Sequence, residues 1–410
     1  MALVKAFCGF RPRADIVSKV AALPYDVYTR QEAKAEVSKE PLSFLKIDRA
    51  EVSFSDDVDT YDERVYQKAK ELLDGMIADG SYLKEEKAVY YIYRLTMLGR
   101  SQTGIVACAS IDDYLNHVIK KHENTREEKE LDRIRHVDTL DAQTGPIFLA
   151  YRSNAVLRDM LTRKKQEEPV YSFISEDNVG HDVWVIDQEQ DIADIEAAFA
   201  DIESLYIADG HHRAASAVKV GIKRRSEHPA YTGKEEFNFF LSVLFPDDEL
   251  LILPYHRVVE DFNGLTKQAL LEKIEEHFEV TIKDQPYTPE KKGTIGMYLE
   301  GTWYRLTLHE HLQEIHPVNG LDVSVLQNKI LGPILGIEDP RTDKRIDFVG
   351  GIKGLGELNR RVSLDMKLAF SMYPTSMSEL FSIADADLLM PPKSTWFEPK
   401  LRSGIFIHQL

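Results

Sequence analysis

The stretch Asp209-Gly210-His211-His212-Arg213 is the part of the sequence that best predicts both a local fold and a functional site. The apolar run 205–208 precedes it, and residues 214–220, which are mostly alanine and valine, lead from it to Gly221. An apolar run, a polar turn with a glycine and a second apolar run predict a buried strand, a tight turn and a helix. We therefore expect the polar residues to form the turn and the start of that helix.

A helix start of this kind is a natural anion site. The first N–H groups of a helix lack partners within it and carry partial positive charge, so they attract phosphate or carboxylate oxygens. Arg213 adds a fork of donors suited to phosphate, and Gly210 lets a ligand approach the backbone. The alternative is a junction that is polar by chance. Packing alone does not explain four consecutive polar groups at a strand end, and we favour the anion site.

Length and composition describe an ordinary globular protein. The chain has 410 residues, of which 43% are hydrophobic and 29% charged, enough for two or three domains. Cys8 and Cys108 are its only cysteines, which excludes a disulfide framework and a multi-cysteine metal site. The first residues lack the pattern of a signal peptide, and no apolar stretch is long enough to cross a bilayer. We expect a cytoplasmic enzyme.

The formal net charge of −17 restricts the partners. Proteins that coat nucleic acid or anionic membranes rely on a basic surface, so we expect neither partner. A small anionic substrate needs only a local positive pocket and stays compatible with this charge. The oligomeric state cannot be read from the residues.

Three units are expected along the chain, and together they predict a mixed α and β (α+β) fold class. Residues 1–110 form an α+β unit, with a helix at 63–79 and a strand hairpin that turns near Gly99. Residues 111–260 mix strands with charged helical stretches and contain the polar stretch described above. Residues 261–410 form a C-terminal domain of strands and helices.

A second polar stretch, Lys121-His122-Glu123-Asn124-Thr125, precedes a run of alternating charges. Thr125 and Glu128 have the spacing of a capping box, which predicts a helix that begins at Arg126. Glu123 then lies in the loop ahead of that helix, where a carboxylate that reaches a cleft can act as a general base. The alternative is a solvated charged helix with a polar lead-in, and the residues alone leave both open.

Other polar features give weaker signals. The adjacent His211 and His212 point apart rather than at one ion, so we expect no dedicated metal site. The loop 391–395 offers a lysine and two hydroxyls to an anion between prolines. The glycine-rich run 350–356 fits neither common phosphate-loop pattern, and we interpret it as turns.

Taken together, these stretches resemble a bacterial domain-of-unknown-function family, number 1015. The similarity spans nearly the full length and is carried by four stretches: Lys121–Thr125, Asp132-Arg133, Thr144-Gly145-Pro146 and Tyr206–Arg213. Three ordered motifs also resemble the free L-serine kinases, which have a ParB/sulfiredoxin-like fold. In this sequence the three motifs are His122-Glu123, the Asp209–Arg213 box and Pro392-Lys393-Ser394-Thr395.

The resemblance implies a fold and an activity. Residues 111–260 would form a ParB/sulfiredoxin-like phosphate-binding core, and the C-terminal domain 261–410 would close the acceptor site. The activity would be transfer of the terminal phosphoryl group of a nucleotide, ATP or ADP, to the hydroxyl of free L-serine. The product would be O-phospho-L-serine, and Mg²⁺ would accompany the nucleotide, held mainly by phosphates.

The resemblance also implies residue roles. Glu123 would take the proton from the serine hydroxyl. Four groups would hold the phosphates: His211, His212, Arg213 and the backbone amides after Gly210. Asp209 would orient a histidine or a Mg²⁺-bound water. The acceptor side would be formed by His122, Lys393, Ser394 and Thr395.

Two departures separate this chain from the short kinases: the unit 1–110 has no counterpart there, and the link between Glu123 and Asp209 is longer. Sulfiredoxin activity is excluded because His211 stands in place of the reactive cysteine. A ParB-type DNA clamp would need a basic region that the chain lacks. Three alternatives stay open: a non-catalytic nucleotide sensor, a kinase for another small hydroxylated metabolite, and the reverse reaction.

Overall fold

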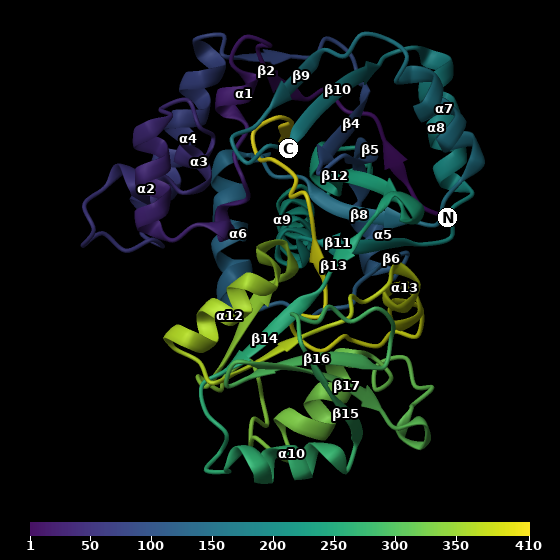
Figure 1. Cartoon of the computed structure of the whole chain (residues 1–410). Coiled ribbons are helices and arrows are strands. Elements are labelled where there is room, and N and C mark those ends of the chain that lie inside the picture. Colours follow the sequence, from purple (N-terminus) through teal and green to yellow (C-terminus); the bar gives the residue numbers. More distant parts are fainter. The chain divides into compact units, whose positions relative to one another are not determined.

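The structure is a computed structural model that describes residues 1–410, and the chain forms two compact units. Unit 1 comprises residues 1–250 and 399–410, and unit 2 comprises residues 251–398. Both contain helices and strands (Figure 1), which confirms the mixed α and β class. The division differs from the expected boundaries at 110 and 260, because strands from both sides of residue 110 hydrogen-bond in one sheet.

Unit 1 is built on a nine-stranded mixed sheet in which β1 pairs with β5 beside the path β6-β11-β8-β12-β5-β4-β10-β9. The pairs β6–β11 and β8–β12 are parallel, and the other neighbours are antiparallel. The strands are β1 (Val4–Lys5), β4 (Tyr90–Met97), β5 (Arg100–Ser110), β6 (Ile119–Lys120), β8 (Ile147–Tyr151), β9 (Tyr171–Ile174), β10 (Gly180–Ile186), β11 (Leu205–Asp209) and β12 (Phe239–Pro246). The predicted hairpin is therefore β4–β5.

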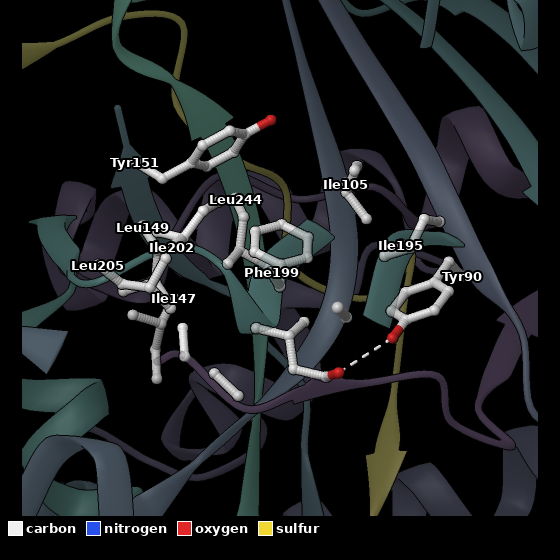
Figure 2. Close-up of a cluster of buried hydrophobic side chains, with 14 of the residues drawn as sticks. Tyr90, Ile105, Ile147, Leu149, Tyr151, Ile195, Phe199, Ile202, Leu205 and Leu244 are labelled. Carbon is white, nitrogen blue, oxygen red and sulfur yellow. Dashed lines mark hydrogen bonds between the residues drawn. The ribbon is translucent and has the colours of Figure 1, made fainter. Parts of the chain in front are cut away.

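One face of this sheet carries the main hydrophobic core (Figure 2). The face is covered by the helices α5 (Ile111–Leu115), α7 (Ala155–Lys164), α8 (Glu189–Ala200) and α9 (His211–Glu227). Phe199 of α8 packs edge to face on Tyr151 with ring centroids 5.3 Å apart. The Tyr90 hydroxyl donates to the Val4 carbonyl (3.1 Å), so its polar end is satisfied inside the core. Burial on this scale, rather than helix propensity, stabilises the helices.

The other face is covered in part by the C-terminal segment of unit 1. Phe406 packs on Tyr91 and Tyr93, with ring centroids 5.0 and 5.6 Å apart. The pairing of β21 (His408–Gln409) with β7 (Ala142–Gln143) fixes the end of the chain there. Residues 399–410 therefore belong to unit 1, although the segment directly before them, residues 251–398, forms unit 2.

A helical layer completes unit 1, and its helices from the first part of the chain, α1 to α4, are purple in Figure 1. It has a core of its own that includes Phe44, Leu45 and Leu73 and joins Leu140 of α6. The helices are α1 (Val17–Val20), α2 (Arg30–Lys39), α3 (Leu45–Asp48), α4 (Glu63–Ala78) and α6 (Glu127–Leu140), joined by the 3₁₀ turns η1 (Tyr25–Val27) and η2 (Ala50–Ser53), and a small sheet pairs β2 (Phe10–Pro12) with β3 (Tyr82–Lys84). The helix expected at 63–79 is α4.

Unit 2 contains a six-stranded antiparallel sheet in the order β15-β17-β16-β19-β14-β18. Its elements are β13 (Ile252–Leu253), β14 (Tyr255–Val259), α10 (Lys267–Glu275), β15 (Phe278–Lys283), β16 (Thr294–Leu299), β17 (Thr302–Leu308), α11 (Asp322–Leu326), β18 (Ile346–Gly350), α12 (Gly354–Leu364), β19 (Leu368–Ser371), α13 (Met377–Asp385) and β20 (Trp396–Phe397). The run 350–356 forms turns only in part, since α12 begins at Gly354. None of the helices in the chain combines the length and the apolar character needed to cross a membrane.

Candidate functional site

The predicted strand, turn and helix at the centre of the site are β11, Gly210 and α9. Gly210 is the residue before the helix and has a φ of 93°, a conformation that glycine adopts without a steric penalty. A Cβ atom at this position would lie 3.0 Å from Nε of Arg213. The glycine therefore meets two demands at once, a left-handed backbone and close approach of the Arg213 side chain. His211, His212 and Arg213 follow in the first turn of α9.

Glu123 reaches this helix start from the loop before α6. Its Oε2 lies 3.8 Å from Nδ1 of His211. The His122 ring lies edge to face on the His211 ring, with centroids 4.5 Å apart. Both imidazoles are buried, whereas the Glu123 side chain keeps 35% of its surface exposed. The two predicted motifs thus meet, and a solvent-accessible carboxylate stands beside the first residue of α9.

The two buried imidazoles are neutral at physiological pH. Burial lowers the pKa of His211 to about 3, with further lowering by His212 and Lys121. Burial also lowers the pKa of His122 well below its usual range. Neither ring nitrogen of His122, nor Nε2 of His211, has a hydrogen-bond partner in the structure. Unsatisfied buried nitrogens carry a free-energy cost that a bound polar group would relieve.

His212 lies between α9 and the start of α6. Its Nε2 accepts a hydrogen bond of 3.0 Å from the backbone N–H of Arg126, the residue that precedes α6. The predicted capping box is wrong, because no side chain of this segment caps the helix and the Thr125 hydroxyl instead donates to the Glu130 carboxylate. The position of the helix start is nevertheless as expected, within one residue.

Asp209 is held by two cations. Oδ2 lies 3.3 Å from Nη2 of Arg213, and Oδ1 lies 3.7 Å from Nζ of Lys400. Burial raises the pKa of Asp209, but Lys400 and Arg213 outweigh it and hold the pKa below the usual range. Arg213 also donates to the Pro146 carbonyl (2.6 Å). Its guanidinium is thus fixed in place at the helix start, which suits it to contact an anion without reorganisation.

The third predicted motif lies in unit 2. The Ser394 hydroxyl is buried and donates to the Pro391 carbonyl (2.6 Å), so it closes its own loop. Arg257 donates to the Lys393 carbonyl (3.0 Å) and fixes a residue with a φ of 59°. The Lys393 side chain is exposed and Thr395 is half-buried. The substrate-binding role of Lys393, Ser394 and Thr395 stays a prediction.

Within unit 1 the structure brings together all the predicted site residues of the first two motifs, namely His122, Glu123, Asp209, Gly210, His211, His212 and Arg213. Sequence reasoning missed Lys400 as an ion-pair partner of the Asp209 carboxylate. It also did not predict that Pro146, quoted only as part of a resemblance, accepts a bond from Arg213. Lys400 carried no local signal, because it follows the unit 2 segment and returns to the site only through the fold.

The site does not offer a ready-made metal centre. No group of three histidine, cysteine or carboxylate side chains in the chain could hold a metal ion. Asp209, the one residue suggested as a Mg²⁺ contact, already faces Lys400 and Arg213. The residues therefore do not fit a Mg²⁺ ion held by the protein alone.

The strand β11, the Gly210 turn and the start of α9 define this chain as a mixed α and β protein with a polar site on a helix N-terminus. The model of a family described as "Protein of unknown function (DUF1015)" matches residues 4–324. This match covers most of the chain, and the chain belongs to that family. No curated protein matches the chain.

Several solved structures are similar to the chain at low identity. A free serine kinase in complex with AMP is 13% identical, with a TM-score of 0.33, and the match covers 73% of this chain and 91% of that one. SbnI from Staphylococcus aureus, truncated at its C-terminus, is 12% identical with a TM-score of 0.38 over 72% and 85%. A conserved hypothetical protein from Pyrococcus furiosus is 13% identical with a TM-score of 0.33 over 74% and 94%.

Proposed function

We propose that this protein is a kinase that transfers the terminal phosphoryl group of a nucleotide, ATP or ADP, to the hydroxyl of free L-serine. The observation that carries the proposal is the Glu123 carboxylate beside His211 at the start of α9. A base next to an anion-binding helix end is the pairing that phosphoryl transfer to an alcohol needs. The resemblance of the three ordered motifs to the free L-serine kinases supports serine as the acceptor.

In the proposed reaction one bond to phosphorus forms, one breaks, and Glu123 takes up the released proton. Glu123 accepts the proton of the serine hydroxyl as that oxygen forms a bond to the terminal phosphorus. The bond from the phosphorus to the bridging oxygen breaks, and the nucleotide leaves shortened by one phosphate. Arg213 and the first N–H groups of α9 stabilise the charge on the transferred oxygens. His211 is neutral and therefore serves as a hydrogen-bonding group rather than as a fixed charge.

Mg²⁺ would enter with the nucleotide, bound by its phosphates, since Asp209 is paired with Lys400 and Arg213. In this arrangement Asp209 positions Arg213 through their ion pair. The chain's own contribution to catalysis is to position the two reactants and to supply the base.

The test is to incubate the purified protein with Mg²⁺, L-serine and either ATP or ADP, and to measure O-phosphoserine by mass spectrometry. Glu123→Gln should lower the rate by about 10²- to 10⁴-fold, the usual contribution of a general base. Glu127→Gln is the matched control, because it removes an exposed carboxylate four residues further along, in the first turn of α6.

Nucleotide binding, measured by calorimetry, should survive in Glu123→Gln. If the wild-type protein binds nucleotide but makes no O-phosphoserine, the serine assignment is wrong. Assays with L-threonine and other small hydroxylated metabolites then separate a different acceptor from a nucleotide sensor. O-phosphoserine offered with a nucleoside diphosphate or monophosphate tests the reverse direction.

A further inference from the structure

We propose that the nucleoside part of the donor nucleotide binds in a cleft between residues 24–28, the helical layer and α6, and that Tyr25 and Arg133 contact it. The residues 1–110 would then complete the nucleotide site. This inference rests on the proposed kinase function, which places the phosphates at the start of α9.

A cavity in unit 1 begins beside Arg213. Its lining includes Tyr25, Arg133, His136 and Thr144, with Leu241 on the apolar side. A larger cleft, with a volume of about 720 Å³, continues from it along the helical layer. Small-molecule sites have volumes of about 300–1,000 Å³. The cavity and the cleft share the lining residues Tyr25, Asp48, Arg133 and His136.

The cavity and Glu123 lie on different sides of α9. Successive helix residues are separated by about 100°, so the side chains of His211 and Arg213 point about 160° apart. His211 faces Glu123, whereas Arg213 and Ala217, one turn later, line the cavity. An acceptor beside Glu123 would leave this opposite side for the rest of the nucleotide.

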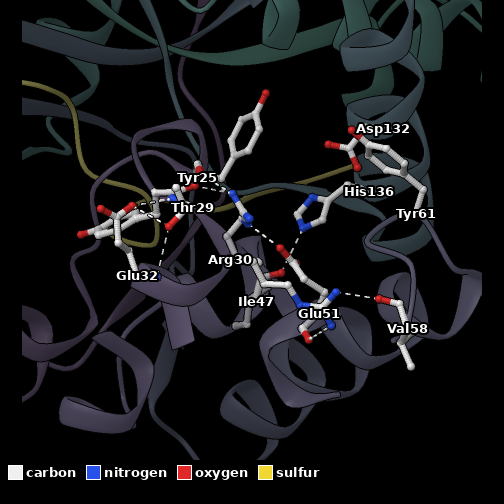
Figure 3. A network of polar contacts seen from close by, with 12 residues as sticks. Tyr25, Thr29, Arg30, Glu32, Ile47, Glu51, Val58, Tyr61, Asp132 and His136 are labelled. Carbon is white, nitrogen blue, oxygen red and sulfur yellow. Dashed lines mark hydrogen bonds and ion pairs between the residues drawn. The ribbon is translucent and has the colours of Figure 1, made fainter. Parts of the chain in front are cut away.

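Tyr25 and Arg133 line both the cavity and the cleft and are in contact with each other. The Arg133 guanidinium lies over the Tyr25 ring, 4.0 Å from its centroid, and is paired with Asp132 (2.9 Å). Arg49 donates to the carbonyls of Tyr25 (3.0 Å) and Tyr28 (2.8 Å), which fixes the turn. In Figure 3 the Tyr25 ring points away from the contacts of Arg30 and Glu51.

The charges along this path are unequal. The cavity near α9 is lined by two guanidinium groups, of Arg133 and Arg213, and by one carboxylate, of Asp48. Arg213, at the helix start, suits phosphate oxygens. The larger cleft is lined by more carboxylates than cationic groups, and buried Asp48, Glu51 and Asp132 are among the carboxylates. Carboxylates accept hydrogen bonds from ribose hydroxyls and base amino groups. A ligand with an anionic end and a neutral, donor-rich end fits this path, and a nucleotide has that form.

Calorimetric binding of ATP, ADP and inorganic tripolyphosphate tests this assignment. Tyr25→Ala should weaken binding of both nucleotides by about 10- to 100-fold, the range of a lost base–aromatic contact. The affinity for tripolyphosphate should stay within about twofold, because its contacts lie at α9. Tyr25→Phe, which keeps the ring, should bind nucleotide nearly as well as the wild type. Retained tripolyphosphate binding in Tyr25→Ala shows that this variant is folded. Tyr231→Ala is the matched control, since Arg225 lies over that ring (5.0 Å) outside the cavity.

Equal losses for nucleotide and tripolyphosphate, or no loss for either, would overturn the assignment of the cleft. If the wild-type protein makes O-phosphoserine and Tyr25→Ala binds nucleotide normally, the assignment of the cleft is wrong and the kinase function is supported. If nucleotide binding depends on Tyr25 but no O-phosphoserine forms, the assignment of the cleft is supported and the serine kinase function is wrong. Absence of any nucleotide binding by the wild-type protein would refute both.

Discussion

Gly210 has a left-handed φ of 93°, and the Arg213 side chain packs against the position where a Cβ atom would lie. We expect Gly210→Ala to destabilise the protein by about 1–2 kcal/mol from the backbone conformation alone. The added Cβ, 3.0 Å from Nε of Arg213, should also displace the guanidinium and abolish tight tripolyphosphate binding. Urea unfolding and calorimetry measure the two effects.

Gly99→Ala is the control for this substitution. Gly99 turns the β4–β5 hairpin with a φ of 77°, and a Cβ there would meet nothing within 4 Å. It should show the conformational cost without the loss of anion binding. If both variants bind tripolyphosphate normally, the contact between Gly210 and Arg213 does not position the anion site.

The sequence predicted those site residues that are neighbours along the chain. Asp209 to Arg213 were recognisable because five adjacent residues sit between two apolar runs, and a strand–helix junction needs only local information. Lys400 and Tyr25 are far from this stretch in sequence. Their contacts with the site depend on which strands pair and where the chain returns, and no local pattern encodes that.

Helices α6 and α9 hold the two motifs together through polar contacts along their length. Lys219 of α9 pairs with the Glu130 carboxylate of α6. The Ser216 hydroxyl lies within hydrogen-bond distance of both the Glu130 carbonyl (3.1 Å) and the His212 carbonyl of its own helix (2.7 Å). Further along, Lys223 and Arg224 pair with Asp138. The loop that carries Glu123 precedes α6, so these contacts set its position relative to His211.

The start of α6 depends on a residue of another helix, since His212 accepts the N–H of Arg126. We expect His212→Ala to cost about 1 kcal/mol, the usual effect of losing a helix cap, and to increase hydrogen exchange in the first turn of α6. His212→Asn, which keeps an acceptor, should recover part of the loss. Unchanged exchange at residues 126–129 in His212→Ala would show that the contact does not cap the helix.

This cap explains why the sequence placed the start of α6 correctly for the wrong reason. The spacing of Thr125 and Glu128 matches a capping box, but tertiary contacts engage the Thr125 hydroxyl with Glu130. By contrast, Ser376 and Glu379 form a capping box at α13, although Lys292 also pairs with Glu379, and Thr29 and Glu32 form one at α2. Helix existence was therefore predictable, and the identity of the capping group was not.

The two units differ from the three expected ones because sheet pairing joins distant parts of the chain. Strand β5 hydrogen-bonds to β4, to β12 and to β1, so residues 1–110 cannot be separated from the core that follows them. Apolar patterning predicted the β4–β5 hairpin and β11 of this sheet, but it contains no information on strand order. Tyr25 belongs to residues 1–110 and lines the same cavity as Arg213, so this part of the chain can contribute to the proposed nucleotide site.

Unit 1 buries several histidines in the neutral state, and its stability should therefore fall in mild acid. Burial lowers the pKa of His181 to about 3 and that of His136 to about 4, as it does for His211. An unperturbed histidine has a pKa of about 6.5. Between that pH and the lowered pKa values of the folded protein, the unfolded chain binds protons at these histidines and the folded chain does not. The free energy of unfolding must then decrease as the pH falls, by about 1 kcal/mol for each such histidine between pH 7 and 5.5.

Hydrogen exchange of the β10 amides at pH 7 and 5.5, corrected for the intrinsic rates, measures this loss. His181→Gln should lower stability at pH 7, because it removes the ring that bonds Tyr93 (2.8 Å) and Ser175 (3.0 Å). It should also reduce the decrease between the two pH values by about 1 kcal/mol. His228→Gln, at an exposed histidine of the same unit, should leave that decrease unchanged. A decrease in His181→Gln as large as in the wild type would mean that protonation of this buried ring does not drive the acid sensitivity.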